Sequence, residues 1–157
     1  MNGDELTVLA IAGPAGAGKS TVGRAVATGL GVPYLDTGAK YRAVTIAVMR
    51  RGVDPHDVEA VAAVATDAAL EFSDDGTLTR VGGDGDDATA EIRGRDVTAN
   101  VSAVAANSQV RTVMVDVQRT WVAERGGAVV EGRDIGSVVF PNADLKLFVP
   151  ASARVRA

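Results

Sequence analysis

The sequence has no cysteine and only one histidine, His56, among its 157 residues. Disulfide bonds, thiolate nucleophiles, cysteine-bound zinc and metal sites built from several histidines are therefore excluded. Aromatic residues make up only 4% of the chain, whereas 46% of the residues are hydrophobic and 23% are charged, as in an ordinary globular domain. Oxygen-bearing side chains, lysine and arginine remain as the groups that carry chemistry.

Positive charge is also scarce, because 16 Lys and Arg residues stand against 20 Asp and Glu residues, for a net charge of −4. A broad phosphate-binding surface for nucleic acid is not expected, so any bound phosphate must be held by a local site. The uncharged stretch at residues 6–18 is too short to span a bilayer, and the acidic N-terminus differs from a signal peptide. We expect a single cytoplasmic domain that binds neither nucleic acid nor a membrane.

Short apolar runs alternate with segments of helical spacing along the chain. The runs lie at residues 6–12, 32–35, 128–131 and 145–149. They are typical of strands that are buried on both faces of a parallel sheet. A Gly- and Asp-rich segment, residues 71–87, predicts a small exposed hairpin. The alternation predicts a three-layer α/β fold in which helices flank a parallel sheet.

Five helices are predicted from apolar spacing and capping residues. They lie at residues 19–30, 39–51, 54–69, 99–107 and 108–125. The first should bury Val22, Ala25, Val26 and Leu30. The third should be capped by Asp54 and bury Val58, Val61, Ala62, Ala65, Ala68 and Ala69. The last should be capped by Ser108 and bury Val110, Val113, Met114, Val117, Trp121 and Val122.

Residues 13–20 match the phosphate-loop pattern G-x-x-x-x-G-K-[ST] at every fixed position, and they lie between a predicted strand and a predicted helix. In such a loop the backbone amides wrap a polyphosphate, Lys19 reaches its β- and γ-phosphates, and Ser20 can ligate Mg²⁺. A glycine-rich turn without a ligand is the alternative, which the strand and helix on either side disfavour. The residues expected to bind a nucleoside triphosphate are Gly13, Pro14, Ala15, Gly16, Ala17, Gly18, Lys19, Ser20 and Thr21, and the motif alone does not choose between kinases, GTPases and motors.

Two polar segments follow the second and third predicted strands, residues 36–42 and residues 131–136. Ligands of doubly wound sheets bind beyond the carboxyl ends of the strands, so both segments should face the same cleft as the phosphate loop. Arg42 and Arg133 should converge on a second phosphate, although a solvated surface ion pair is the alternative for each. Asp36 either holds a Mg²⁺-bound water or caps the second helix.

These motifs resemble the bacterial cytidylate kinases along nearly the whole chain. The matching segments are residues 13–21, 35–45, 90–106 and 130–148, and the pattern GRDIG-x-VVFP-x-ADLK in the last segment is the most specific. The resemblance implies a monomeric enzyme with a P-loop NTPase fold that transfers the γ-phosphoryl group of ATP to CMP or dCMP with Mg²⁺. It also implies that residues 1–157 form one kinase core, in which residues 71–107 are the insertion that binds the nucleoside monophosphate.

The resemblance further implies roles for individual residues. Lys19, Arg42 and Arg133 would be catalytic, and Thr37, Tyr41, Arg42, Ser102, Arg111, Arg133 and Asp134 would bind CMP. Cytosine offers an amino group that suits Asp134 and acceptor atoms that suit Arg111 and Ser102, whereas uracil reverses part of that polarity. Without the resemblance, Arg111 would be interpreted as a charged residue on a helix surface. Ser102 would be interpreted as a residue whose hydroxyl donates to a backbone carbonyl of its own helix.

The sequence departs from the family pattern at three places. Ala12 stands where the family usually has Asp, and Lys40 stands where it usually has Met. The sequence ends just after Arg156, which matches the first arginine of the family's lid, so we expect it to be part of a longer polypeptide. The alternatives are a catalytically impaired nucleotide-binding remnant, and another small-molecule P-loop kinase of the UMP/CMP or shikimate type.

Overall fold

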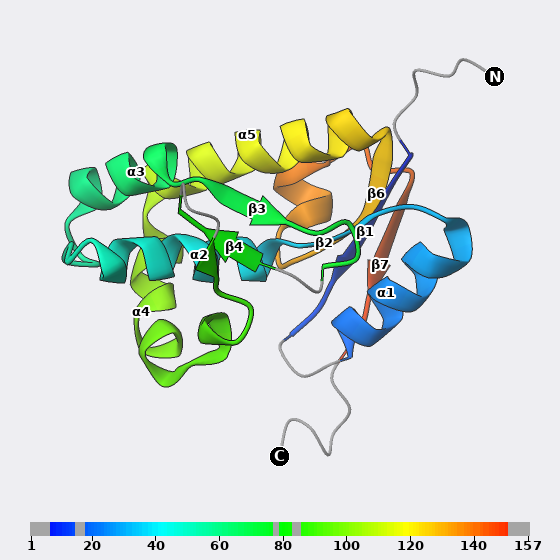
Figure 1. The fold of residues 1–157 in the computed structure, drawn as a ribbon. Helices are drawn as coiled ribbons and strands as arrows, with labels where there is room; N and C mark the ends of the chain where they lie inside the picture. Colours follow the sequence, from blue (N-terminus) through cyan, green and yellow to red (C-terminus); the bar gives the residue numbers. More distant parts are fainter. Residues whose placement is uncertain (1–6, 15–17, 77–78, 83–85, 151–157) are drawn as a thin grey trace. The chain divides into compact units, whose positions relative to one another are not determined.

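The computed structural model describes residues 7–14, 18–76, 79–82 and 86–150. The chain forms two units, residues 1–37 together with 118–157, and residues 38–117. Figure 1 follows both units along the chain.

A four-stranded parallel sheet organises the first unit. Its strands are β1 (Thr7–Ala12), β2 (Tyr34–Asp36), β6 (Gly127–Glu131) and β7 (Leu145–Phe148). They lie in the order β2-β6-β1-β7, and each neighbouring pair is parallel (Figure 1). Residues 8–11 of the inner strand β1 are all buried, which requires cover on both faces of the sheet. The predicted α/β class and parallel sheet are therefore confirmed.

Helix α1 (Lys19–Leu30) contacts β1, β2 and β6, but not with the face that the sequence predicts. The predicted face of Val22, Ala25, Val26 and Leu30 is wrong at three positions: Val22 is 38% exposed, Leu30 is 56% exposed and Ala25 is exposed, whereas Val26 is half-buried and packs against the core. Gly23 and Ala27 are the buried residues of this helix. A β-carbon at Gly23 would lie 2.7 Å from Cε2 of Tyr34, so the missing side chain allows close approach of the helix to the sheet.

A short π-helix, η2 (Ile135–Val139), follows β6 and contacts β1. The sequence pattern predicts no helix or strand at these residues. Arg119 near the end of α5 (Ser108–Arg125) donates from Nε to the Val139 carbonyl at 2.9 Å and from Nη2 to the Val138 carbonyl at 3.1 Å. These two bonds satisfy carbonyl groups at the end of the π-helix, and they hold η2 in place.

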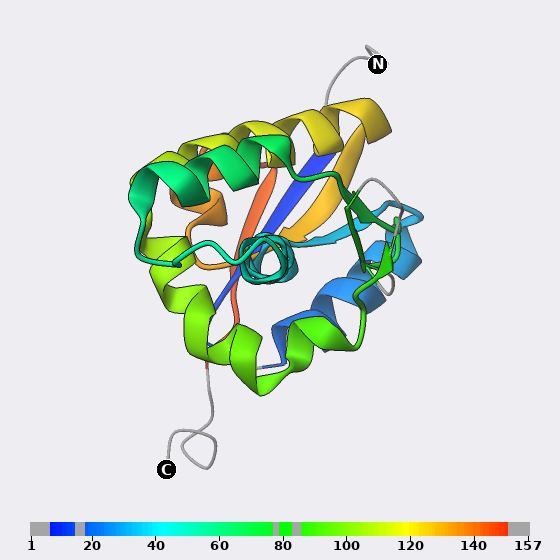
Figure 2. The same ribbon diagram turned by 60° about the vertical axis from the view of Figure 1, so that its left-hand side comes forward.

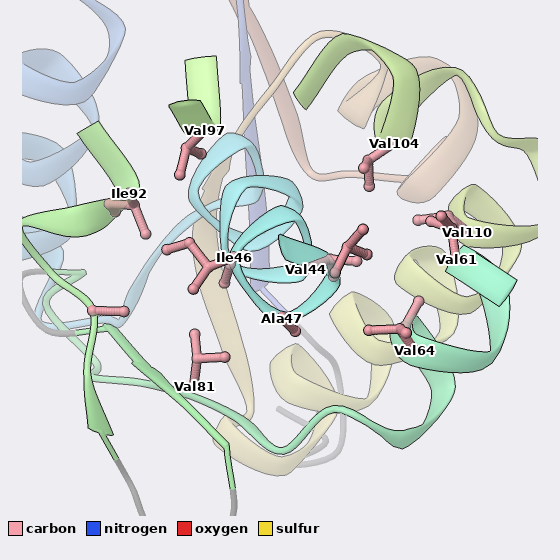
Figure 3. Packing of buried hydrophobic residues seen from close by; sticks show 14 of the residues in the cluster. Val44, Ile46, Ala47, Val61, Val64, Val81, Ile92, Val97, Val104 and Val110 are labelled. Atoms are coloured by element: carbon pink, nitrogen blue, oxygen red, sulfur yellow. The ribbon is translucent and has the colours of Figure 1, made fainter. Parts of the chain in front are cut away.

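The second unit centres on α2 (Thr37–Arg50), most of which belongs to it. Figure 2 views α2 almost end-on, with α3 (Val58–Asp67), α4 (Arg95–Ala106) and α5 around it. All six residues 43–48 of α2 are buried, as expected of a helix covered on all sides. Their side chains pack with residues of the surrounding elements, among them Val61, Val64, Val97, Val104 and Val110 (Figure 3).

The first residues of α3 correct a predicted cap. Asp57, not Asp54, caps this helix, because its Oδ1 accepts a hydrogen bond from the Ala60 amide at 3.1 Å. Asp54 instead accepts from the His56 amide at 2.9 Å in the preceding turn. Both aspartates suit a cap, and the turn between them decides which one is used. The predicted apolar stripe shifts too: Val58 is exposed, and the buried residues are Val61, Ala62, Val64 and Ala65.

The first residues of α5 correct a second cap. Asn107 Oδ1 accepts from the amides of Gln109 and Val110, at 3.0 and 3.3 Å, so Asn107 and not Ser108 satisfies the free amides of this helix. Asn107 also donates from Nδ2 to the Val58 carbonyl at 2.9 Å. The predicted apolar stripe of α5 is confirmed, since each of its residues is buried or half-buried. Helix α4 begins four residues before the predicted start.

The Gly- and Asp-rich segment forms a small antiparallel sheet, as predicted, with one more strand than a hairpin. Its strands are β3 (Leu70–Phe72), β4 (Thr79–Val81) and β5 (Asp86–Asp87), in the order β3-β4-β5. A 3₁₀ turn, η1 (Glu91–Arg93), leads from this sheet to α4. Across the described parts of both units, we find no helix with the length and hydropathy needed to cross a membrane.

Candidate functional site

Two glycines mark the ends of the phosphate loop. Gly13 follows β1 with a φ of +153°, and a β-carbon there would collide with the Val149 carbonyl. Gly18 stands at the N-cap of α1 in the left-handed conformation, with a φ of 88°. Pro14 is described between them, whereas Ala15, Gly16 and Ala17 lie outside the described residues. The strand, loop and helix order that the motif requires is confirmed.

The first two residues of α1 carry the polar groups of the motif. Lys19 donates from Nζ to the Gly13 carbonyl at 2.6 Å, so its ammonium group lies across the loop. Ser20 donates from Oγ to Oε1 of Glu131 at 2.9 Å. Thr21 is exposed on the same helix. The Ser20 bond joins residues 111 positions apart in the sequence, and it brings a carboxylate to the phosphate loop.

Glu131 is a functional candidate that the sequence patterns do not single out. It is the last residue of β6, it pairs in register with Ile11 of β1, and it is only 4% exposed. Burial raises the pKa of its carboxyl group, the nearby charge of Asp36 raises it further, and interactions with Tyr34, Ser20 and Lys19 lower it. Its position at the carboxyl end of a buried strand, beside the strand that leads into the loop, was the available signal.

Strand β2 supplies two more polar groups to this end of the sheet. Asp36 pairs in register with Glu131, and its charge acts on that carboxyl group. Tyr34, two residues earlier, is 1% exposed, and its ring contacts the space left by Gly23. Burial raises the pKa of the Tyr34 hydroxyl, and the charge of Asp36 adds to the effect. Ser20, Tyr34, Asp36 and Glu131 thus form one polar cluster, which we call the loop cluster.

The loop cluster suits a magnesium ion that arrives with phosphates. Its hydroxyl and carboxylate oxygens are the ligands that Mg²⁺ prefers, and one oxygen of Glu131, Oε2, is buried without a hydrogen-bond partner among the described residues. No group of three or more His, Cys, Asp or Glu residues in the described ranges could hold a metal ion by itself. Proteins that bind Mg²⁺ through one or two carboxylates usually rely on substrate phosphates for the other ligands.

Three residues expected to bind CMP belong to the first unit. Thr37 is buried and donates from Oγ1 to the Glu131 carbonyl at 2.8 Å, and a β-carbon at Gly132 would collide with this hydroxyl. Thr37 therefore ties the start of α2 to the end of β6. Arg133 is exposed and Asp134 is half-buried, just before the π-helix. As predicted, both follow a strand of the parallel sheet at its carboxyl end.

The other expected CMP residues belong to the second unit. Arg42 on α2 donates from Nη1 to the Ile92 carbonyl at 2.9 Å and to Oγ1 of Thr98 at 3.1 Å, which the sequence did not suggest. Tyr41 precedes it and is half-buried, while Ser102 on α4 and Arg111 on α5 are exposed. The convergence of Arg42 with Arg133 joins two units and stays a prediction. Arg156 lies outside the described residues.

Lys40 is the only basic residue among the buried side chains that the structure describes. It is 1% exposed, and its Nζ lies 4.9 Å from the centre of the Phe72 ring in β3. A cation above an aromatic face is stabilised by the ring electrons. Lys40 thus links α2 to the small antiparallel sheet from inside the second unit.

Comparisons with known proteins place the chain in one family. Residues 9–157 match the family model described as cytidylate kinase. The chain is 51% identical over 152 residues to the cytidylate kinase of Mycolicibacterium paratuberculosis, with 96% of this chain and 66% of that protein covered. It is 50% identical over 150 residues to the cytidylate kinase of Corynebacterium diphtheriae, with 96% and 65% covered.

A fusion protein is also similar. The bifunctional pantoate ligase/cytidylate kinase of Trichormus variabilis is 48% identical over 157 residues, which cover 98% of this chain and 29% of that protein. The chain spans 65–66% of the length of the two cytidylate kinases above, just under two thirds.

Proposed function

We propose, from the premise that this chain belongs to the cytidylate kinase family, that it carries the core of an enzyme that phosphorylates CMP, and dCMP, with ATP. The reaction moves the γ-phosphoryl group of ATP to a phosphate oxygen of the acceptor and yields ADP with CDP or dCDP. The observation that carries the proposal is the loop between β1 and α1, with Lys19 across it and Ser20 bound to Glu131.

On the ATP side, the loop supplies positive groups where the phosphates would lie. The amides at the start of α1 and the Lys19 ammonium neutralise phosphate charge, and Lys19 exchanges its bond to the Gly13 carbonyl for one to a phosphate. Ser20, with Asp36 and Glu131 behind it, would hold Mg²⁺, which supplies charge neutralisation on the β- and γ-phosphates. Positioning and electrostatics account for catalysis of this kind.

On the acceptor side, arginines orient the CMP phosphate for in-line attack. Ile92 and Thr98 bind only Nη1 of Arg42, and a guanidinium group has five N–H donors, so donors remain for a phosphate. Arg133 would supply the second clamp. No general base is needed because the attacking oxygen is already anionic. Asp134, Arg111 and Ser102 would recognise cytosine by its amino group and acceptor atoms.

The test is ADP formation by this 157-residue chain with Mg·ATP and each of CMP, dCMP, UMP and AMP. Selective turnover with CMP or dCMP is the expected result. Equal turnover with UMP or AMP would contradict the cytosine site and favour another small-molecule P-loop kinase. If a folded chain is silent with all four, calorimetric titration follows: CMP binding would identify an impaired nucleotide-binding remnant, and no binding would overturn the proposal.

Several expectations from the sequence stay predictions beside this proposal. They are the cytoplasmic location, the monomeric state, the single kinase core over residues 1–157 and the assignment of residues 71–107 to the binding of the nucleoside monophosphate. The preference between CMP and dCMP is decided by the same nucleotide panel.

A further inference from the structure

Two buried polar atoms of the loop cluster complement each other. The Tyr34 hydroxyl is a donor and Oε2 of Glu131 is an acceptor, and each is buried without a hydrogen-bond partner among the described residues. A buried polar group without a partner costs free energy, so nearly all such groups in folded proteins are paired with protein or with water. A donor and an acceptor that are both left over in the loop cluster could therefore satisfy each other.

The strand register places the two side chains on the same face of the sheet. Asp36 lies opposite Glu131, and Tyr34 is two residues before Asp36, so the side chains of Tyr34 and Glu131 project to the same side of neighbouring strands. The hydroxyl of Tyr34 is close enough to Glu131 and Ser20 for each to affect its pKa. Ser20 bonds to the other oxygen of the same carboxylate.

Packing alone does not account for the hydroxyl group. The Tyr34 ring fills the space that Gly23 leaves on α1, with Ile11 beside it, and the Arg24 guanidinium lies 5.4 Å from the ring centre. Phenylalanine has the same ring and would fill the same space. What tyrosine adds at this position is one buried hydroxyl donor.

We propose that Tyr34 is a positioning residue of the phosphate site, whose hydroxyl donates to Oε2 of Glu131 through one water, or directly after a small rotation of the side chain, and thereby orients the carboxylate toward Ser20. The bonds then run from Tyr34 to Glu131 and from Ser20 to Glu131. Because Ser20 donates its hydroxyl hydrogen bond to Oε1, the lone pairs of the Ser20 oxygen remain available to a cation that is bound to phosphates. The link to Mg·ATP rests on the proposed function.

The first experiment compares Tyr34→Phe with Ile11→Val. Tyr34→Phe removes the hydroxyl group and keeps the ring, whereas Ile11→Val changes the packing beside the ring and removes no polar group. Calorimetry measures the affinity for ATP with Mg²⁺ and with EDTA, and thermal unfolding measures stability. Loss of a group that orients a metal ligand typically lowers affinity about 10- to 100-fold, so we expect Tyr34→Phe to weaken Mg·ATP binding by about that factor and to leave ATP binding in EDTA unchanged.

Ile11→Val should lower the unfolding temperature slightly and leave the Mg²⁺ dependence unchanged. An equal loss of Mg·ATP affinity in both variants would overturn the proposal, because it would show a packing effect. An equal loss with and without Mg²⁺ in Tyr34→Phe would also overturn it. In a Glu131→Gln background, removal of the Tyr34 hydroxyl should produce no further loss of Mg²⁺ dependence, and a further loss as large as in the unmodified chain would contradict the proposed contact.

A second measurement needs no nucleotide and separates this inference from the proposed function. The chain has two tyrosines, so Tyr41→Phe leaves Tyr34 as the only one. A phenol that donates to a carboxylate absorbs at longer wavelength than one that does not, so the tyrosine band should shift to shorter wavelength when Glu131→Gln is added. An unchanged band would overturn the proposed contact even if the chain makes CDP. The expected shift in a chain without kinase activity would support the contact and reject the kinase.

Discussion

The candidate residues of the two units are held in different ways. In the first unit, Ser20 and Thr37 both bond to Glu131, the first to its carboxylate and the second to its carbonyl, at the end of a parallel sheet. In the second unit, Ser102 and Arg111 are exposed on helix surfaces. The difference matches the proposed tasks, since charge stabilisation during phosphoryl transfer requires groups that are fixed beforehand, whereas base recognition requires groups that reach a ligand.

The two units also differ in what their elements pack against. In the first unit the inner strands β1 and β6 are buried, whereas β7 exposes Leu145 and Phe148, and small residues such as Gly23 let a helix approach the sheet. The second unit surrounds one helix, α2, whose buried residues include the charged Lys40. The candidate residues of the first unit are therefore bonded to the end of strand β6. Those of the second unit are side chains on helices that pack around α2.

Lys19→Ala tests whether the fixed groups of the first unit stabilise charge during phosphoryl transfer. If the fixed groups of the first unit perform the charge stabilisation, turnover of CMP should fall about 10²- to 10³-fold, as when one preorganised donor is removed. Stability should change little, because Lys19 is half-buried and its hydrogen bond among the described residues is to a loop carbonyl. ADP release and thermal unfolding measure the two effects. Lys146→Ala, which removes an exposed lysine from the same unit, is the control. Normal turnover in Lys19→Ala would remove the loop from the mechanism.

Asp134→Ala tests a residue that belongs to the first unit but is assigned to recognition of the base. The loss in kcat/KM should be larger for CMP than for UMP by about 1–3 kcal/mol, if the carboxylate accepts a bond from the cytosine amino group. The two substrates are compared at the same Mg²⁺ concentration. Asp116→Ala removes an exposed acidic residue of α5 and should affect both substrates equally. Equal losses in Asp134→Ala would assign Asp134 to the metal or to structure.

The smallest effect concerns the core of the second unit. Asn107→Ala removes the cap of α5 and a bond to the Val58 carbonyl, so the free energy of unfolding should fall by about 1–2 kcal/mol. Urea denaturation measures the change. Ser108→Ala is the matched control, because Ser108 is the neighbouring residue that the sequence favoured as the cap and it is exposed. A larger cost for Ser108→Ala than for Asn107→Ala would contradict the observed capping bonds.

Helix caps show where prediction from sequence stops. Asp54 and Asp57 are both good caps, as are Asn107 and Ser108, and local chemistry does not choose between them. The choice was made by bonds outside the helix, such as the one from Asn107 to the Val58 carbonyl. The face of α1 was mispredicted for a related reason. Hydrophobic spacing ranks Val22 above Gly23, but the bulky Tyr34 ring opposite the helix favours the residue with no side chain.

The parallel α/β fold and the phosphate loop can be predicted from the sequence alone, because the strand, the glycine-rich turn and the helix are neighbours along the chain and their signals are local. The sequence also determines which residue types are available for chemistry. The tertiary structure is needed to show that Glu131 and Tyr34 lie with Ser20 beside the phosphate loop. These residues are distant in sequence, and they meet because β6 lies between β2 and β1 in the sheet. Strand order is set by the packing of the whole unit, which no short segment encodes.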